Sequence, residues 1–300
     1  MLKKIVRVSF VILLGAGIAL WGFSSCGITV RPENPTVKQA ESWSPDRLEK
    51  DWDRFLKSFV SEDGLVDYAA IKKKPQQLDV VYAQLAEFSP DSHPSLFSSD
   101  EERFAYWLNA YNIAVVRGVI EHYPVGSVME VKTSSPLSLL ENGGFFVGQK
   151  FLFGGKGKDL YRLENSLIRK RYHDPRLHFA LNCASGGCPE LPQEAFQGDK
   201  LEEQLERETL KFMNSERAFQ IDHEKEEMTV SQLFAWYRED FTAFLEKEGT
   251  PEETVLDYIA RYLRGERLEE FKKARQQGYA QIDQEYDWSL NDSRSEVAAP

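Results

Sequence analysis

The stretch "DEERFAYWLNAYNIAVVRGVIEHYP", residues 100–124, predicts the central element of the fold. At 100° per residue it forms a helix whose apolar side chains lie on nearly every face, and such a helix is buried in the middle of a protein. Asn109 and Asn112 lie on one stripe of this helix. Because a buried amide without a partner costs about 1 to 3 kcal/mol, both side chains need polar partners. Two interpretations are open: the amides hold loop backbone in place, or they line a site.

The elements around this helix are short. "SPDRLEKDWDRFLKSFV" predicts a helix with Ser44 as its N-cap and Pro45 at its first position, and a further helix is expected from about Pro75 to Phe88. "FFVGQKFLFGGKGKDL" (145–160) and "RAFQIDHEKEEMTV" (217–230) show the alternation of hairpins, and more helices are expected near 201–213 and 252–276. We expect one mostly helical α+β domain with a small antiparallel sheet of short hairpins. The glycines of the first hairpin lack the order of a phosphate loop, so no cofactor is expected.

The N-terminus has the layout of an export signal. A basic start and an apolar run from Val8 to Trp21 are followed by "FSSC", which resembles a bacterial lipobox ending at Cys26. Residues 1–25 are therefore predicted to be a lipoprotein signal peptide and Cys26 the lipidation site. The alternative is a retained membrane anchor, although the apolar run is shorter than the ~20 residues that a spanning helix needs. Both interpretations place the domain outside the cytoplasm, and the first makes it a membrane-anchored lipoprotein of the bacterial cell envelope that faces the periplasm.

The chain divides into a tether, a domain and a tail. Residues 27–43 lack periodic apolar positions and are predicted to be a flexible tether, residues 44–292 form the domain, and residues 293–300 are expected to be disordered. The formal charge is −11, and it becomes −14 if Lys3, Lys4 and Arg7 are removed with the signal. A chain this acidic is not expected to bind nucleic acid, which needs clustered Lys and Arg.

A second stretch, "RLHFALNCASGGCPEL" (176–191), carries the chemistry. Cys183 and Cys188 are the thiols left if Cys26 is lipidated, and a pair in an oxidising compartment is first a disulfide candidate. If "LHFALNC" is a strand, His178 and Cys183 point to opposite faces, whereas the glycine turn places the two cysteines opposite each other. A disulfide, a catalytic thiol and a metal site are all open at this point.

The catalytic alternative uses Cys183 as nucleophile, His178 as base and Glu164 as the group that orients the base. Asn109 or Asn112 would donate a hydrogen bond to an oxyanion. This alternative needs a break in the strand at Asn182. A zinc site from His173, His178, Cys183 and Cys188 is the weakest alternative because its cysteine spacing is loose, and no metal is expected.

Four motifs in order resemble a known family. "FAYWLNAYNIAVVRGVIEHYP", "DPRLHFALNCASGGCPEL", "FAWYREDF" and "YDWSLND" are similar to bacterial members of the family called domain of unknown function 547, over about Val66 to Asp292. The resemblance implies an exported protein or lipoprotein, and plant relatives are discussed as interaction proteins. The motif positions it implies are Asn109, Asn112, Glu164, Arg176, His178, Cys183, Cys188, Trp236, Asp240 and Trp288, among which Arg176, Trp236 and Asp240 would support the site.

Two functions compete. The first is a thiol-dependent hydrolase or transferase that acts on amide or peptide-like substrates. The second is a non-catalytic periplasmic interaction domain for a protein or peptide, with a Cys183 to Cys188 disulfide. A ring nitrogen of His178 next to a cysteine sulfur would favour the enzyme, and two bonded sulfurs would favour the interaction domain.

Overall fold

The predicted helices around the centre of the fold are confirmed. The computed structural model describes residues 28–32, 43–133 and 143–294. Helix α1 (Pro45–Phe59) begins after Ser44, whose hydroxyl accepts the N–H of Arg47 at 3.3 Å. Helix α3 (Gln76–Glu87) follows the short α2 (Tyr68–Lys73), which the sequence patterns did not indicate. Helix α4 (Asp100–His122) is buried continuously from Phe104 to Ile120, as its all-round apolar pattern predicts.

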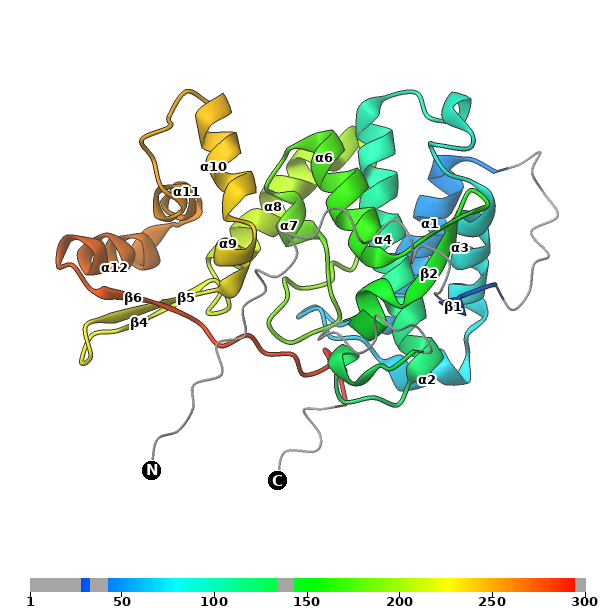
Figure 1. Cartoon of the computed structure of the whole chain (residues 1–300), viewed down its shortest axis with the longest axis horizontal. Coiled ribbons are helices and arrows are strands. Elements are labelled where there is room, and N and C mark those ends of the chain that lie inside the picture. The colour runs from blue at the N-terminus through cyan, green and yellow to red at the C-terminus, as the bar shows by residue number, and fades with distance from the viewer. Residues whose placement is uncertain (1–27, 33–42, 134–142, 295–300) are drawn as a thin grey trace.

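Helix α4 is the axis of a first hydrophobic core. Helices α1 and α3 lie on one side of it and the segment around α6 on the other (Figure 1). The connecting elements of this part are short, and they comprise η2 (Pro94–Leu96), η3 (Val128–Glu130), η5 (Gly143–Val147), α5 (Leu160–Arg162), η6 (Leu163–Ile168), α6 (Arg169–Tyr172) and η7 (Gly198–Lys200).

Both predicted hairpins form, and each is widened by a parallel strand. Strand β2 (Gln149–Phe153) pairs antiparallel with β3 (Lys156–Lys158), and β4 (Phe219–Asp222) pairs antiparallel with β5 (Glu227–Val230). Strand β1 (Ile28–Thr29) lies parallel to β2, and β6 (Ala280–Asp283) lies parallel to β5. The prediction of one antiparallel sheet is therefore incomplete, because the described residues form two small mixed sheets.

Strand β1 also corrects the predicted tether. Ile28 is in register with Gln149, Val30 is buried, and the carbonyl of Val30 accepts the hydroxyl of Tyr82 at 2.7 Å. The start of the segment assigned to a tether is thus part of the fold. The signal peptide, Cys26, residues 33–42 of the tether and residues 295–300 of the tail lie outside the described residues. The N–H of Ser293 donates to Val66, so ordered contacts reach position 293.

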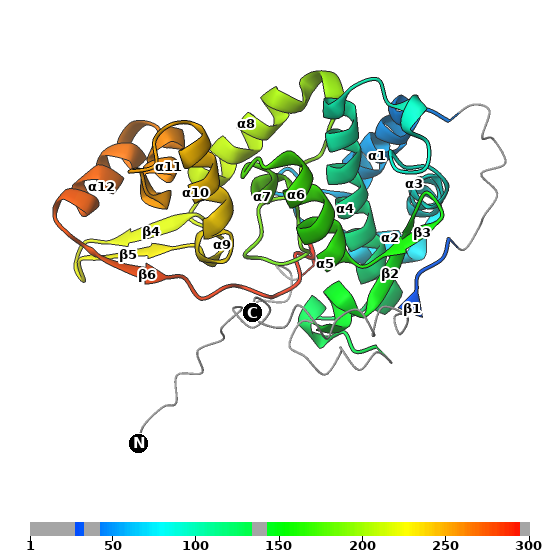
Figure 2. The ribbon, with the colours of Figure 1, turned by 45° about the horizontal axis from the view of Figure 1, so that its top comes forward.

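A second hydrophobic core is built by the C-terminal elements. It contains residues of β4 and β5 with α9 (Gln232–Trp236), α10 (Arg238–Lys247), α11 (Val255–Tyr262) and α12 (Gly265–Gln276), and the exposed strand β6 lies at the edge of the sheet. Figure 2 shows these elements at one end of the molecule and α1 to α4 at the other, with α7 (Leu177–Ala180) and α8 (Leu201–Met213) between them. Helix α8 joins the two cores because Leu201 and Leu205 belong to the first and Phe212 and Met213 to the second.

The predicted strand over "LHFALNC" is wrong. Residues 177–180 form helix α7, and the chain becomes extended only at Leu181. The cause is local: the side chain of Asp174 accepts the N–H of Arg176, and the carbonyls of Asp174 and Pro175 accept the N–H groups of Leu177 and His178. An Asp-Pro pair initiates a turn in this way. No helix within the described residues is long and apolar enough to span a bilayer.

Candidate functional site

The two cysteines of the glycine turn are bonded to each other. Cys183 and Cys188 form a disulfide with a Cα to Cα distance of 6.1 Å, and the N–H of Cys183 donates to Cys188 Sγ at 2.9 Å. The disulfide interpretation is confirmed. The zinc alternative is wrong because bonded sulfurs are not thiolate ligands, and no group of three or more metal-binding side chains occurs in the part of the chain that the structure describes.

The C-terminal segment holds the turn in place. The N–H groups of Gly186 and Gly187 donate to the carbonyls of Ser289 and Asp287 at 2.8 and 2.9 Å. A Cβ atom at Gly186 would collide with the carboxylate of Asp287, so this side chain would have to move if any other residue replaced the glycine. Ala184 has a φ of 61°, a left-handed conformation that is uncommon for a residue with a Cβ atom. Such conformations persist where surrounding contacts fix the backbone.

The two sulfurs have different surroundings. Cys183 is half-buried, whereas Cys188 is only 4% exposed. Cys183 Sγ lies 3.0 Å from the Ser185 hydroxyl and 3.2 Å from the Tyr286 hydroxyl. Burial raises the pKa of Tyr286 well above its usual value, so this hydroxyl keeps its proton and can donate to the sulfur.

His178 is oriented by Asp240 instead of Glu164, which corrects the predicted catalytic arrangement. His178 Nε2 lies 2.7 Å from Asp240 Oδ2, and Arg169 donates from Nε and Nη2 to the two oxygens of the same carboxylate at 2.6 and 2.9 Å. Burial of Asp240 favours its neutral form, but the hydrogen bonds from His178 and Arg169 outweigh it and lower its pKa to about 2. Burial lowers the pKa of His178 against the pull of Asp240. At neutral pH the imidazole is therefore neutral, Nε2–H donates to Asp240, and Nδ1 carries the lone pair.

Glu164 is held by two tyrosines. It lies in η6, a π-helical segment between α5 and α6, and such segments occur often at functional sites. Its carboxylate accepts the hydroxyl of Tyr237 at 2.6 Å and that of Tyr111 at 3.2 Å. Burial, together with the charge of Glu164, raises the pKa of both tyrosines, so both remain donors. Glu164 is linked to His178 through the Tyr237 ring, which stacks on the imidazole at 3.8 Å.

The side-chain amides of Asn109 and Asn112 each form two hydrogen bonds to backbone, one through the nitrogen and one through the oxygen. Asn109 donates to the carbonyl of Phe196 at 2.8 Å and accepts the N–H of Phe196 at 2.9 Å. Asn112 donates to the carbonyl of Ala180 and accepts the N–H of Asn182, each at 2.9 Å. The contacts favour the first interpretation of these residues, in which the amides hold loops. Asn112 fixes the segment that leads from α7 to Cys183.

The residues that were expected to support the site lie in two different parts of the molecule. Arg176 binds Asp174 and Glu202 through its guanidinium, so it ties α7 to α8 at the surface. Trp236 packs on Tyr286 with ring centroids 4.8 Å apart, and Trp288 lies 4.6 Å from the same tyrosine ring. Trp236 and Trp288 therefore reach the cysteine turn through Tyr286.

Four residues of this region were missed by the sequence interpretation. Tyr237 and Tyr286 stand inside the motifs "FAWYREDF" and "YDWSLND", so the motifs could have indicated them. Ser185 lies in the turn itself. Arg169 had no signal, because an arginine in a short helix is usually a solvated surface residue.

A polar cavity of about 430 Å³ opens beside the turn. Gly186, Gly187 and Tyr286 form one wall of it, and the β4 and α9 region forms the opposite wall. Its charged lining consists of four acids and one base, Glu190, Glu216, Glu285, Asp287 and Arg217. Arg217 is paired with Glu190 at 3.0 Å, so the cavity is acidic.

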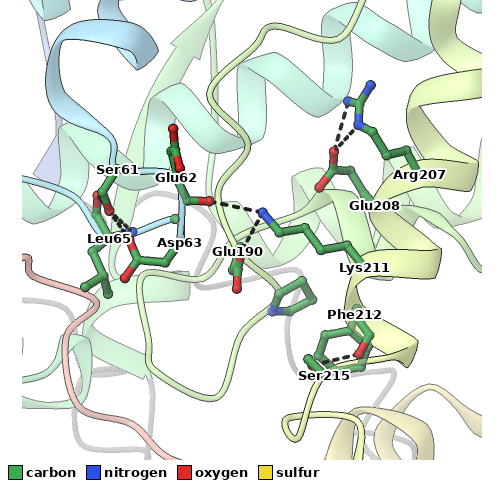
Figure 3. A network of polar contacts seen from close by, with 12 residues as sticks. Ser61, Glu62, Asp63, Leu65, Glu190, Arg207, Glu208, Lys211, Phe212 and Ser215 are labelled. Atoms are coloured by element: carbon green, nitrogen blue, oxygen red, sulfur yellow. Dashed lines mark hydrogen bonds and ion pairs between the residues drawn. The ribbon is translucent and has the colours of Figure 1, made fainter. Parts of the chain in front are cut away.

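The far end of the turn is anchored by Glu190, as Figure 3 shows. Lys211 of α8 lies 2.5 Å from Glu190 Oε2 and donates to the carbonyl of Glu62 at 3.2 Å. Gly64 has a φ of 77°, and a Cβ atom there would lie 2.6 Å from the Cβ atom of Glu190. The glycine at 64 is thus required both by its backbone conformation and by this close approach.

The comparisons with known proteins support the resemblance over part of the chain. The family model described as "Protein of unknown function, DUF547" matches residues 95–213. The matched part runs from the start of α4 through the cysteine turn to the end of α8, and the motifs around Trp236 and Trp288 lie beyond it. Neither a curated protein nor a solved structure has a significant match to the chain.

Proposed function

We propose that the domain is a non-catalytic binding module for a protein or peptide, with the cysteine turn as one wall of its binding cavity. The observation that carries this proposal is the disulfide, which removes the nucleophile that a thiol enzyme would need. The cavity of about 430 Å³ has the size of a small-ligand or side-chain pocket.

Thiol labelling tests the module. In a chain with Cys26→Ser, Cys183 and Cys188 are the remaining cysteines. Without reductant, a maleimide probe is expected to leave the folded protein unlabelled. Stoichiometric and rapid labelling of Cys183 without reductant would contradict the proposal.

The proposed setting is the bacterial cell envelope, with the domain facing the periplasm and anchored by lipid at Cys26. The "FSSC" sequence supports this setting. Strand β1 starts two residues after Cys26, so a lipid at this position would hold the first sheet within about 10 Å of the membrane surface. Metabolic labelling with palmitate tests the anchor: the wild-type chain is expected to incorporate label in the membrane fraction and Cys26→Ser to incorporate none.

A second candidate is the thiol-dependent hydrolase or transferase, present in a reduced state. The specific observation in its favour is the buried imidazole, whose bond to Asp240 leaves the lone pair on Nδ1, where a general base needs it. Reduced protein is then expected to hydrolyse activated amides or esters, and His178→Gln is expected to lose at least ~100-fold of that rate. Equal rates for the reduced wild type and His178→Gln would rule this candidate out.

A further inference from the structure

The Cys183–Cys188 disulfide is one of several constraints on the turn that contains it. A bridge between residues five apart closes a very small loop, for which the loss of chain entropy corresponds to about a 40-fold change in the folding equilibrium. The turn has other constraints: Gly186 and Gly187 donate to Ser289 and Asp287, and Asn182 Nδ2 donates to the carbonyl of Pro189 at 2.8 Å. These bonds do not involve sulfur. They keep the two cysteines facing each other whether or not the sulfurs are bonded.

The two sulfurs are unequal in the way that thiol exchange requires. An incoming thiolate has to reach one sulfur while the other departs with the electron pair. Cys183 is half-buried and Cys188 is only 4% exposed, so Cys183 is the more accessible of the two residues. Cys188 Sγ already accepts the N–H of Cys183 at 2.9 Å, so a negative charge that forms on this sulfur meets a donor.

The sulfur of Cys183 has possible donors of its own. The hydroxyls of Ser185 and Tyr286 lie 3.0 and 3.2 Å from Cys183 Sγ, and they lie 3.1 Å from each other. A structural disulfide needs no such partners. Both hydroxyls can stabilise a Cys183 thiolate once the bridge is broken.

We infer that the bridge is redox-active, with Cys183 as the sulfur that exchanges with an external dithiol and Cys188 as its buried partner. A thiolate of the dithiol attacks Cys183 Sγ and forms a mixed disulfide, and the bond to Cys188 breaks with its electron pair on Cys188 Sγ. The second thiol of the reductant then loses its proton and attacks its own sulfur in the mixed disulfide. The reductant leaves as a disulfide and Cys183 leaves as a thiolate, so two electrons have passed to the protein. The two protons that the dithiol released to solvent are taken up by the Cys188 and Cys183 thiolates, which completes the reduction to two thiols. This exchange does not depend on the proposed binding function.

Trapping the mixed disulfide tests the inference. The folded chain with Cys26→Ser is treated with glutathione, quenched with acid and analysed by mass spectrometry after digestion. The adduct is expected on Cys183, with Cys188 as the free thiol. An adduct on Cys188, or equal amounts on both cysteines, overturns the inference.

The rate of reduction gives a second and independent test. Dithiothreitol is expected to reduce the bridge of the folded protein without denaturant, with two thiols labelled at completion. Tyr286→Phe keeps the ring but removes one donor to Cys183, and it is expected to slow reduction by about tenfold. Tyr279→Phe is the matched control, because its hydroxyl contacts His223 at the far end of β6, and it is expected to leave the rate unchanged. A bridge that resists dithiothreitol until urea unfolds the protein, or equal rates for both variants, contradicts the inference.

Discussion

At the scale of single residues, the buried polar cluster around His178 makes one contribution to the way stability depends on pH. His178 lies among Asp240, Arg169, Glu164 and the ring of Tyr237. Burial dominates and lowers the pKa of the imidazole, so the folded state holds it neutral where the unfolded chain, with a pKa of 6.5, binds a proton. The contribution of His178 to stability therefore falls as the pH drops below 6.5, because the unfolded state takes up its proton first. Burial raises the pKa of Glu49 to about 7, and this carboxyl acts in the opposite direction over the same range.

This gives the first prediction, on pH and stability. The free energy of unfolding is measured by urea titration for the wild type and for His178→Gln, and the difference between the two is expected to be constant between pH 8 and 7 and to decrease from pH 6.5 to pH 5. The His178→Gln variant has no imidazole at this position, so it has no such contribution to lose. The low pKa of Asp240 adds a further loss only when the pH falls from 3.8 toward about 2. An unchanged slope in His178→Gln would contradict this account.

The second prediction concerns the two donors to Glu164. Tyr237→Phe removes the hydrogen bond of 2.6 Å and leaves the stacking on His178 in place, and Tyr111→Phe removes the bond of 3.2 Å. Tyr237→Phe is expected to cost about 1 to 3 kcal/mol of unfolding free energy, since the bond goes to a buried carboxylate, and Tyr111→Phe is expected to cost less. Urea unfolding of both variants measures the difference. A larger loss for Tyr111→Phe would mean that the bond lengths do not rank the two donors.

At the scale of elements, α4 acts through the loops that its two asparagines hold. Asn109 satisfies both backbone groups of Phe196, which lies far along the chain but next to η7. Asn109→Ala removes the hydrogen-bond partners of the buried N–H and carbonyl groups of Phe196, and it is expected to destabilise the protein by about 2 to 4 kcal/mol. Asn214→Ala is the control: Asn214 also binds backbone, at Leu210 and Tyr262, but it is exposed and water can replace it.

The Asn214→Ala variant is expected to lose less than about 1 kcal/mol. Thermal and urea unfolding measure both changes. Similar losses in the two asparagine variants would show that burial of the amide is not what makes Asn109 important.

The elements that were predicted correctly are those whose signal is local. Helix α4 follows from its apolar residues on all sides, α1 from Ser44 and Pro45, and both hairpins from alternation with glycine turns. Helix α7 was missed because four residues are too few to show a helical period, and alternation over the same residues mimicked a strand. Strands β1 and β6 were missed because parallel pairing with distant strands leaves no mark on their own sequence.

The candidate site shows the same limit. The cysteine pair was predictable because its partners are five residues apart, so the glycine turn alone brings them together. His178 and Asp240 are 62 residues apart and meet only because α7 and α10 pack beside each other, and so Glu164 was assigned the role that Asp240 has. Spacing along the chain indicates local pairs, and tertiary packing decides which of several acids meets a buried histidine.

At the scale of the whole molecule, the two cores are joined at few places, and the last described segment is one of them. After β6 the chain returns from the second core toward the first along one side of the molecule (Figure 2). On its way it pairs with the cysteine turn at Asp287 and Ser289, and at its end Asn291 accepts both the Val66 N–H and the Tyr68 hydroxyl. The turn that carries the disulfide is thus positioned by a segment that is itself fixed on the first core.

The last prediction follows from Asn291. Its side chain is 5% exposed, accepts the Tyr68 hydroxyl at 2.8 Å and donates to Asn182 Oδ1 at 3.3 Å. Asn291→Ala leaves the buried Tyr68 hydroxyl without this acceptor and removes one of the two donors to Asn182 Oδ1, the other being the N–H of Ala184. The end of the segment should therefore detach first, and the amides of Gly186 and Gly187 should exchange with solvent at least ~10-fold faster, while amides in α1 change little. Hydrogen exchange measured by NMR or mass spectrometry checks this. Equal acceleration of exchange in α1 and in the turn would mean that the segment unfolds only together with the whole molecule. The cysteine turn would then be positioned by the global fold and not by the segment of residues 286–291.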